Sequence, residues 1–349
     1  MTTIASHLQE KDVITMKSRI EVNRLPSRQV PDHEGMVWIP GGRFNMGSDT
    51  HYAEEYPVHA VTVDGFWMDR CAVTNQQWSR FVEATGYLTI AERVQPQSSV
   101  PASMVFRKPK ERVDLRNSYN WWTWLPGADW QHPEGPASSV EDREDHPVVH
   151  IGYEDAEAYA TWMGAELPTE AEWEFAARGG IDGAEYVWGN ELTPGGTHLA
   201  NTWQGDFPWQ NLRADGYETT SPVAAFPPNS YGLYDMAGNV WEWTSDWFRK
   251  HSGKPSCCGT INPTGGRREE SCDPRLPLSS PRKVVKGGSF LCAPNHSRRY
   301  RPAARLAQAI DASACDLGFR CVIRAETKPD LVRTPRLIET TCVYSAMDL

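Results

Sequence analysis

The clearest structural signal in the sequence is the stretch Leu167-Pro168-Thr169-Glu170-Ala171-Glu172-Trp173-Glu174. Thr169 is a residue type that caps helices, and Glu172, three positions later, completes a capping box. Trp173 and Ala176 then fall on one face at helical spacing, and Gly179 follows where such a helix would end. The stretch therefore predicts a short helix that buries a tryptophan.

Two more helices and a strand are predicted on the N-terminal side of this stretch. The first helix follows Thr74, with Gln77 completing a capping box and Gly86 ending the helix. The second is predicted over residues 155–163, where alanine and tyrosine recur at helical spacing. Residues 36–39 are apolar and are followed by a Pro-Gly-Gly turn signal, which is typical of a short strand.

The composition predicts a fold with many loops. The chain has 349 residues and contains 15 Trp, 27 Gly and 26 Pro. Glycine and proline interrupt helices and strands, so short elements packed around large aromatic side chains are expected. Residues 34–325 contain no linker and are interpreted as one compact domain. Residues 1–33 are predicted to be disordered or loosely docked, and residues 326–349 to form a tail.

The charge balance argues against a nucleic-acid partner. The formal net charge is -10, with 35 basic and 45 acidic residues, whereas a protein that binds a phosphate backbone needs a basic face. No apolar run approaches the roughly 20 residues that cross a bilayer, so no membrane partner is expected. The N-terminus lacks the apolar segment of a secretory signal. A cytoplasmic location is therefore expected.

Eight cysteines are present, and no pair has the C-x-x-C spacing of a structural zinc site. Without a secretory signal, free thiols or metal ligands are expected rather than a disulfide framework. Cys257, Cys258 and Cys272 lie in a Gly/Pro/Arg-rich segment and are interpreted as surface thiols of an insertion.

Seven segments, taken in order, make the chain resemble the formylglycine-generating enzymes, also called the sulfatase-modifying factor family. The resemblance spans most of the chain and implies an α+β fold related to C-type lectins, a single compact domain with little regular secondary structure. The segments are Gly-Gly-Arg-Phe-Asn-Met-Gly-Ser (41–48), Asp-His-Pro-Val-Val-His (145–150), Leu-Pro-Thr-Glu-Ala-Glu-Trp-Glu (167–174), Asn-Thr-Trp-Gln-Gly (201–205), Tyr-Gly-Leu-Tyr-Asp-Met-Ala-Gly-Asn-Val-Trp-Glu-Trp (231–243), Gly-Gly-Ser-Phe-Leu-Cys (287–292) and Leu-Gly-Phe-Arg-Cys (317–321).

The family resemblance implies an oxidase that uses O2 to convert a cysteine in a Cys-x-Pro-x-Arg segment of a sulfatase to Cα-formylglycine. In this family two cysteines, five residues apart, bind Cu(I), a soft ion that prefers sulfur. The resemblance also implies a monomer that works on a sulfatase polypeptide. The wider superfamily includes hercynine oxygenases, whose additional helical domain with a histidine cluster has no counterpart in this sequence.

The first family cysteine corresponds to Cys292, but Ser297 occupies the position of the second. A serine hydroxyl is a hard, neutral group and a poor ligand for Cu(I). Ser289 matches the family residue that would orient substrate or oxygen by a hydrogen bond, or it caps a turn. A positive environment lowers the pKa of a thiol, and four nearby arginines are expected to supply one: Arg298, Arg299, Arg301 and Arg305.

Four explanations of Ser297 stay open at the level of sequence. The serine is an engineered replacement that traps a state of a normal oxidase, or another donor completes the copper site. The candidate donors are Cys315, Cys321 and His296. Alternatively, the protein is a paralogue that binds the peptide without oxidising it, or an oxygenase of the same fold that acts on a small molecule. Cys292 itself has a plainer interpretation as a buried core thiol, because cysteine is among the most buried residue types.

The resemblance also implies two structural calcium ions, which favour six to eight oxygen ligands. The first set of ligands is Asp235, Gly238, Val240 and Glu242, and the second is Asn201, Thr202, Asp215 and Tyr217. Without the resemblance, the acidic residues of these sets would be interpreted as turn and surface carboxylates.

Two histidines and three tryptophans in or next to the family segments are given structural roles. His146 and His150 are interpreted as satisfied structural histidines rather than a metal pair, and Trp241, Trp243 and Trp247 as core and groove wall.

Overall fold

The computed structural model describes residues 33–94, 99–251, 259–275 and 279–324. Apart from His33, the predicted N-terminal segment lies outside these residues, as do the predicted tail at 326–349 and both Cys257 and Cys258. The domain limits of 34 and 325 therefore stay predictions. In the described ranges, no helix has the length and apolar character that a bilayer crossing requires.

All three predicted helices are present. Helix α1 spans Asn75–Thr85, α2 spans Tyr153–Trp162 and α3 spans Glu170–Arg178. The capping boxes predicted at Thr74 and Thr169 both form, and Gly86 and Gly179 end their helices in the left-handed conformation.

Helix α2 begins two residues earlier than predicted. Gly152 is its N-cap, and the Asp155 side chain reaches back 2.7 Å to accept the Gly152 backbone N–H. Asp155 is therefore the third residue of the helix and not its first, as the sequence had predicted. A cap without a side chain leaves no signal at its own position, which is why the sequence pattern placed the start too late.

The strands form three small sheets and a hairpin. The bounds of the strands are β1 (Met36–Ile39), β2 (Gly42–Met46), β3 (His59–Val63), β4 (Phe66–Asp69), β5 (Ala102–Phe106), β6 (Trp122–Pro126), β7 (Trp241–Trp247), β8 (Thr260–Ile261), β9 (Arg282–Lys286), β10 (Leu306–Ala309), β11 (Leu317–Gly318) and β12 (Val322–Arg324). The sheet orders are β1-β4-β12, β10-β9-β7-β11 and β2-β3-β8, and β5 pairs with β6. Short 3-10 turns lie at Ile90–Glu92, Ser118–Asn120, Pro194–Gly196 and Arg268–Glu270.

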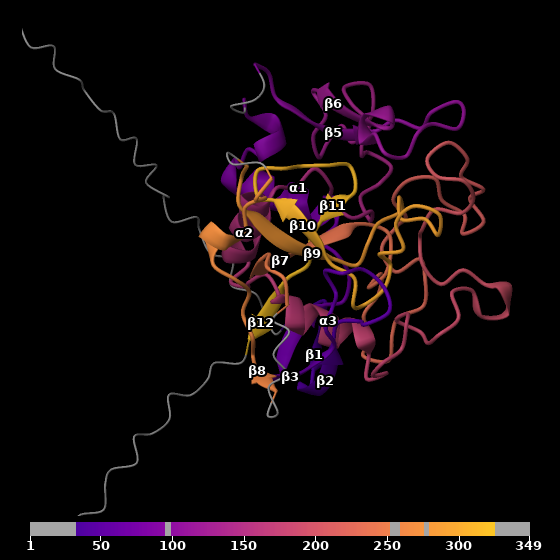
Figure 1. Ribbon diagram of the computed structural model, residues 1–349. Coiled ribbons are helices and arrows are strands. Elements are labelled where there is room, and N and C mark those ends of the chain that lie inside the picture. The colour runs from indigo at the N-terminus through magenta and orange to yellow at the C-terminus, as the bar shows by residue number, and fades with distance from the viewer. Residues whose placement is uncertain (1–32, 95–98, 252–258, 276–278, 325–349) are drawn as a thin grey trace, which may run out of the picture.

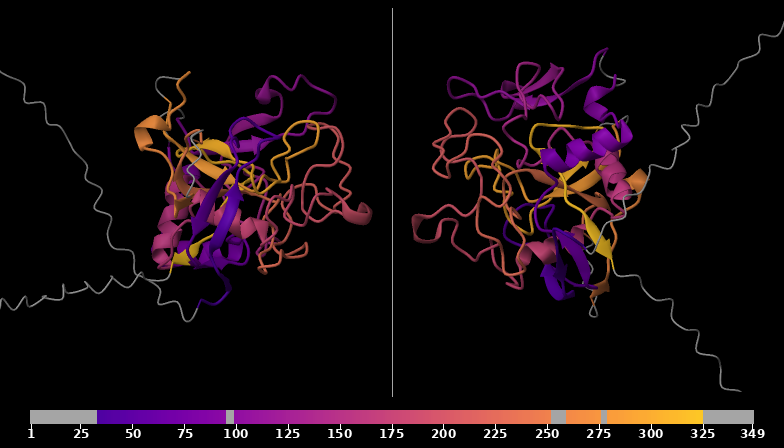
Figure 2. Two further views of the ribbon diagram at one scale, coloured as in Figure 1. Left: turned by 60° about the horizontal axis from the view of Figure 1, so that its bottom comes forward. Right: turned by 180° about the vertical axis from the view of Figure 1, so that it is seen from behind.

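The four-stranded sheet lies in the middle of the molecule (Figure 1). The β5–β6 hairpin lies at one end and the β2-β3-β8 sheet at the other, and both views of Figure 2 agree on this arrangement. Long connections between α3 and β7 form a broad lobe on one side that has little regular structure. The predicted α+β fold with one compact, loop-rich domain is confirmed.

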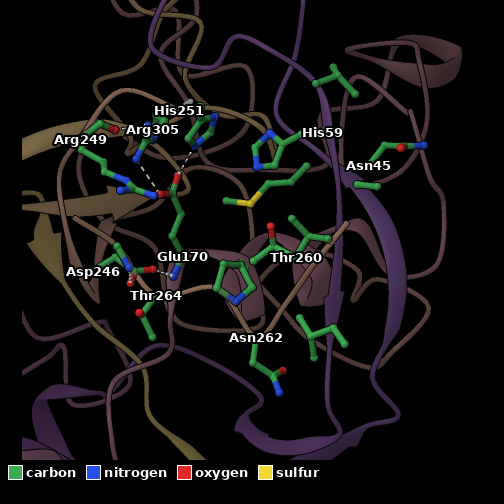
Figure 3. Close-up of a pocket in the computed structure, with 18 of the residues that line it drawn as sticks. Asn45, His59, Glu170, Asp246, Arg249, His251, Thr260, Asn262, Thr264 and Arg305 are labelled. Atoms are coloured by element: carbon green, nitrogen blue, oxygen red, sulfur yellow. Dashed lines mark hydrogen bonds and ion pairs between the residues drawn. The ribbon is translucent and has the colours of Figure 1, made fainter. Parts of the chain in front are cut away.

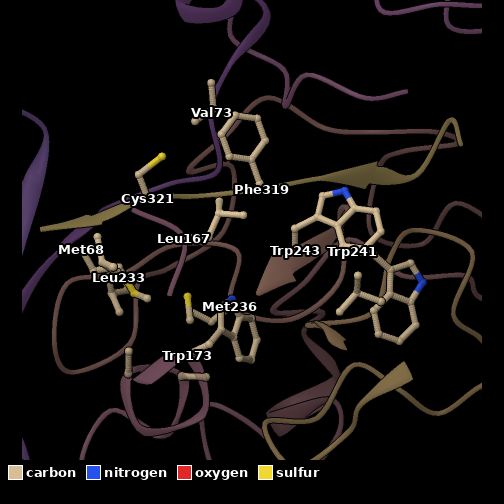
Figure 4. Close-up of a cluster of buried hydrophobic side chains, with 14 of the residues drawn as sticks. Met68, Val73, Leu167, Trp173, Leu233, Met236, Trp241, Trp243, Phe319 and Cys321 are labelled. Atoms are coloured by element: carbon tan, nitrogen blue, oxygen red, sulfur yellow. The ribbon is translucent and has the colours of Figure 1, made fainter. Parts of the chain in front are cut away.

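Large aromatic side chains fill the core, as the tryptophan count predicted. Trp78, Trp173 and Trp243 are fully buried. Figure 4 shows Trp173 of α3 and Trp243 of β7 converging with apolar residues from distant segments, such as Met68 and Phe319. Burying an aromatic side chain removes a large apolar area from water, so a few such residues can hold together elements that are only two to eleven residues long.

Candidate active site

A tight turn after strand β9 places the predicted catalytic residues. Gly288 has a φ of 72°, and a Cβ atom there would lie 2.8 Å from the carbonyl oxygen of Arg299. Only glycine allows so close a passage of two backbone segments. The turn that follows is closed by the Cys292 N–H, which donates to the Ser289 carbonyl at 2.9 Å. The sequence therefore brings Ser289 and Cys292 together, as predicted.

The Ser297 hydroxyl contacts the Cys292 thiol. The Cys292 sulfur lies 3.7 Å from the Ser297 Oγ, and the Ser289 backbone N–H points at the same sulfur from 3.4 Å. Cys292 is only 2% exposed, whereas Ser297 is partly exposed at the end of an exposed turn formed by residues 294–296. Of this pair, Ser297 is therefore the residue nearer to solvent.

Asp316 completes the site and was missed by the sequence analysis. Its Oδ2 accepts the hydroxyl hydrogen of Ser289 at 2.7 Å, and both residues are buried. Asp316 directly precedes the Leu317–Cys321 motif, so its place next to a family segment was the available signal. Its contact with Ser289, far away in the sequence, was not visible from the motif.

The four arginines do not give the Cys292 thiol the lowered pKa that the sequence predicted, although the charge of Arg299 acts in that direction. Each one is paired with a different glutamate, so the charges largely cancel. Burial raises the pKa of the Cys292 thiol, and the weaker opposing effects of the Ser289 N–H and of Ser297 do not reverse this. The expectation of an activated thiolate was therefore wrong for this arrangement. The pairs are Arg298–Glu185, Arg299–Glu54, Arg301–Glu55 and Arg305–Glu170.

The three candidate replacement donors make contacts of their own. The Cys315 sulfur accepts the Phe106 backbone N–H at 3.3 Å inside a separate aromatic cluster. Cys321 is buried in the main core, beside Asp69. His296 stacks on Phe207 with ring centroids 4.5 Å apart. Cys292 and Ser297 supply one sulfur between them, so this pair does not fit a two-thiolate Cu(I) site.

One carboxylate of the first predicted calcium set, that of Glu242, is paired with an arginine. The Arg320 guanidinium donates to both carboxylate oxygens of Glu242 at 2.7 Å, and the Trp173 indole donates to one of them at 2.7 Å. Glu242 is 1% exposed and Arg320 fully buried. A calcium ion bound by Glu242 would have to share this carboxylate with the Arg320 cation, so calcium at the set with Asp235, Gly238 and Val240 stays a prediction and is less favoured than at the second set.

The second predicted calcium set is gathered around one carboxylate. Asp215 accepts the backbone N–H of Thr202 at 2.9 Å and that of Tyr217 at 3.0 Å. The Asn201 carbonyl lies in the same loop crossing, where it accepts the Asn239 N–H at 2.9 Å. A Cβ atom on Gly238 would lie 2.0 Å from that carbonyl oxygen, so the crossing requires glycine. These amide, carbonyl and carboxylate oxygens are the hard donors that calcium prefers.

The structural interpretation of the histidines agrees with the contacts. His150 is fully buried, and its ring nitrogens contact the Ser103 hydroxyl at 2.7 Å and the Pro133 carbonyl at 2.9 Å. His146 contacts the Thr220 hydroxyl at 2.9 Å. Trp241 and Trp243 are buried in the core and Trp247 is partly buried beside them.

A separate cavity of about 630 Å³ opens between the start of α3 and strands β3 and β8 (Figure 3). Glu170 at its base is paired with Arg305 at 2.7 Å, and His251 lies 3.9 Å from the same carboxylate. Neither Cys292 nor Ser297 lines this cavity. The predicted catalytic residues therefore belong to a different part of the surface.

Comparison with known proteins gives one consistent family. The model of a sulfatase-modifying factor enzyme 1-like domain matches residues 22–325. The formylglycine-generating enzyme of Mycobacterium tuberculosis is 48% identical over 300 residues, which cover 82% of this chain and 97% of that protein. The formylglycine-generating enzyme of Mus musculus is 46% identical over 290 residues, which cover 82% and 74%.

A second relative carries a different name. The inactive C-alpha-formylglycine-generating enzyme 2 of Mus musculus is 38% identical over 302 residues, which cover 85% of this chain and 88% of that protein. Among solved structures, PvdO from Pseudomonas aeruginosa has a TM-score of 0.57 at 23% identity and covers 83% of this chain and 94% of that one. At this level of identity the likeness shows the fold alone.

Proposed function

The chain belongs to the sulfatase-modifying factor family of formylglycine-generating enzymes, and from this we propose that it oxidises a cysteine of a sulfatase to Cα-formylglycine with O2. The identity of nearly one half to enzymes of that name supports an enzyme that acts on a sulfatase. The finer part of the proposal is the Cys-x-Pro-x-Arg context of the client cysteine. The proposed enzyme acts as a monomer, as expected from the family resemblance.

One observation carries the proposal: a buried thiol held in a fixed turn directly beneath an exposed loop. Cys292 occupies the family's catalytic position, and hydrogen bonds from two segments fix its surroundings. The approach past Ser297 is the route that a client peptide would take.

The proposed reaction balances with O2 as the only oxidant. The client Cβ loses one hydrogen and its bond to sulfur, and gains a double bond to oxygen. The sulfur leaves as hydrogen sulfide, and the two electrons taken from the Cβ reduce O2. With one water consumed, O2 is reduced to hydrogen peroxide. When two further thiols are oxidised to a disulfide and supply two more electrons, the other oxygen atom of O2 leaves as water and no water is consumed.

Copper stays a prediction that rests on the family resemblance. A Cu(I) ion would supply O2 chemistry that no amino-acid side chain has. Of positions 292 and 297, only Cys292 offers a sulfur ligand to copper. The Cys315 and Cys321 thiols are engaged in contacts of their own, with Phe106 and with Asp69. The copper content of the purified protein, measured by elemental analysis, tests this part by itself.

Calcium is proposed only at the Asn201, Thr202, Asp215 and Tyr217 set. Its oxygens come from two segments of the lobe without regular structure, and an ion there would cross-link them. The role would be structural, because the set lies in loops that have few backbone ladders of their own.

A second candidate function is binding of the client peptide without oxidation. Ser297 favours it, because a hydroxyl stands where the family's second thiol would be. The name of the 38% identical Mus musculus relative shows that a protein with this fold can be inactive. The two candidates share the client peptide and differ only in whether it is changed.

A peptide assay separates the two functions. The chain, a Ser297→Cys variant and a Cys292→Ser variant are incubated with a Cys-x-Pro-x-Arg peptide, copper and O2, and the peptide mass is measured. The oxidase predicts conversion of cysteine to aldehyde by the parent chain, faster conversion by Ser297→Cys and none by Cys292→Ser. A peptide that co-elutes with all three proteins at unchanged mass would establish the binding protein instead.

A further inference from the structure

Asp316 is a buried carboxylate for which the proposed reaction has no assigned role. We propose that Asp316 is a positioning residue: by accepting the Ser289 hydroxyl hydrogen, it fixes the turn that holds the Cys292 sulfur under Ser297. The inference rests on the proposed function, because it concerns the same thiol. It names a residue that acts on the site through another residue and does not touch the client.

The contact of Asp316 with Ser289 removes the freedom of the hydroxyl. At 2.7 Å, with a charged acceptor, this is a short hydrogen bond of the stronger kind. The Ser289 oxygen also accepts the Leu291 backbone N–H at 3.3 Å. The Ser289 hydroxyl therefore both donates and accepts a hydrogen bond, and these two bonds fix its rotamer.

The fixed Ser289 in turn fixes Cys292 from two directions. Its carbonyl accepts the Cys292 N–H at 2.9 Å, and its own N–H points at the Cys292 sulfur at 3.4 Å. The sulfur then lies 3.7 Å from the Ser297 hydroxyl. Without the anchor on Ser289, the turn would keep its backbone bond but lose the constraint that sets the position of the sulfur.

Asp316 is itself held rigidly by strands on both sides. The preceding residue, Cys315, donates its N–H to the Met104 carbonyl of β5 at 3.0 Å. The Asp316 carbonyl accepts the Trp241 N–H of β7 at 2.8 Å, and Leu317 begins β11. The carboxylate thus ties the thiol turn to the central sheet, as supporting residues around functional groups commonly do.

Burial separates this role from client binding. Ser289 is fully buried and Asp316 is 6% exposed, so neither can form part of the surface that a peptide first meets. Loss of Asp316 should therefore lower kcat and leave the KM for the peptide close to that of the parent chain.

Four variants test the proposal: Asp316→Ala, Asp316→Asn, Ser289→Ala and the double variant Ser289→Ala/Asp316→Ala. Loss of supporting residues typically lowers activity by about 10- to 100-fold, and a kcat decrease of that size is expected for Asp316→Ala. Asp316→Asn keeps an acceptor oxygen and should restore most of the turnover. The double variant should be no slower than the slower single variant, because both changes break one linkage.

A second readout does not depend on turnover. The rate at which iodoacetamide alkylates Cys292 at constant pH, followed by peptide mass spectrometry, should rise in Asp316→Ala and return towards the parent rate in Asp316→Asn. Asp155→Ala is the matched control. Asp155 is also a buried carboxylate, and it accepts hydrogen bonds from Gly152, Ile90 and Tyr87. It should lower the melting temperature without changing the alkylation of Cys292 in the folded protein.

The outcomes are distinct. An Asp316→Ala protein with parental turnover and parental alkylation would overturn the proposal, as would additive losses in the double variant. If the parent chain makes no aldehyde, the proposed function fails. The alkylation rates would then still decide whether Asp316 positions the thiol.

Discussion

Glu242 shows how a sequence pattern can identify an important side chain without revealing the partner that folding brings to it. The family segment marks Glu242 as a calcium ligand, whereas the structure pairs it with the Arg320 guanidinium at 2.7 Å through both oxygens. Arg320 belongs to a second family segment, about eighty residues further along the chain. An acidic residue in a carbonyl-rich loop suits either cation, and only the spatial neighbour decides between them.

Arg320→Ala tests this assignment. Removing one partner of a buried ion pair leaves an uncompensated charge and typically costs about 3 to 5 kcal/mol, so the free energy of unfolding in urea should fall by that order. The control is Arg116→Ala, because both Arg116 and its partner Asp114 are exposed, and the loss there should be much smaller. If calcium were the true partner of Glu242, adding calcium would restore the stability of Arg320→Ala.

At the scale of elements, the helices were predictable because their signals are local. Thr169 and Glu172 bond to each other's backbone within one turn. The sheets were not predictable in the same way. Strand β12 pairs with β4 through Met68 and Val322, which lie far apart in the sequence, and two-residue strands such as β8 leave no periodicity to detect.

The N-cap of α3 gives a prediction at this scale. Thr169→Ala removes the hydroxyl that accepts the Glu172 N–H at 3.1 Å, and losing such a cap costs about 1 kcal/mol. The melting temperature should fall accordingly. Thr169→Ser keeps the hydroxyl and should stay close to the parent chain. Equal losses in the two variants would mean that the cap contributes through packing of the threonine methyl group instead.

The loops around Asp215 give a second prediction. If calcium cross-links them, a chelator should lower the melting temperature, and added calcium should restore it, because an ion that binds only the folded state stabilises that state. Asp215→Asn should abolish this response, whereas Asp206→Asn, at a half-exposed aspartate paired with Arg112, should keep it. A melting temperature that is insensitive to the chelator in the parent chain would remove the calcium site.

At the scale of the whole molecule, the sequence located the site but not its electrostatics. The segment that carries Ser289 and Cys292 was recognisable, and the structure brings these two residues together with Ser297. The arginines that follow were also recognisable. The glutamates that neutralise them come from three separate regions of the chain, so their effect on the Cys292 thiol appears only after folding. Asp316 was missed for the same reason.

The buried charges behind α3 make the stability of the molecule depend on pH. Burial by itself would raise the pKa of Glu174, but Lys286 and Arg178, with the Gly47 N–H, outweigh burial and lower it to about 2. A carboxyl group whose pKa is lower in the folded state stabilises that state above the unfolded pKa of 4.5. The contribution is lost as the pH falls from about 4.5 to 2, and by the pKa difference it amounts to about 3 kcal/mol.

Unfolding measured in urea between pH 2 and 5 tests this contribution. The parent chain should lose stability steeply with acid, whereas Glu174→Gln should be less stable at pH 5 and show a flatter dependence, since a glutamine cannot titrate. Glu166→Gln, at a largely exposed position, should keep the parental slope. Because Glu174 holds both Lys286 of β9 and Arg178 of α3, its protonation releases two buried cations at once. Parallel slopes for Glu174→Gln and the parent chain would show that other carboxylates cause the acid sensitivity.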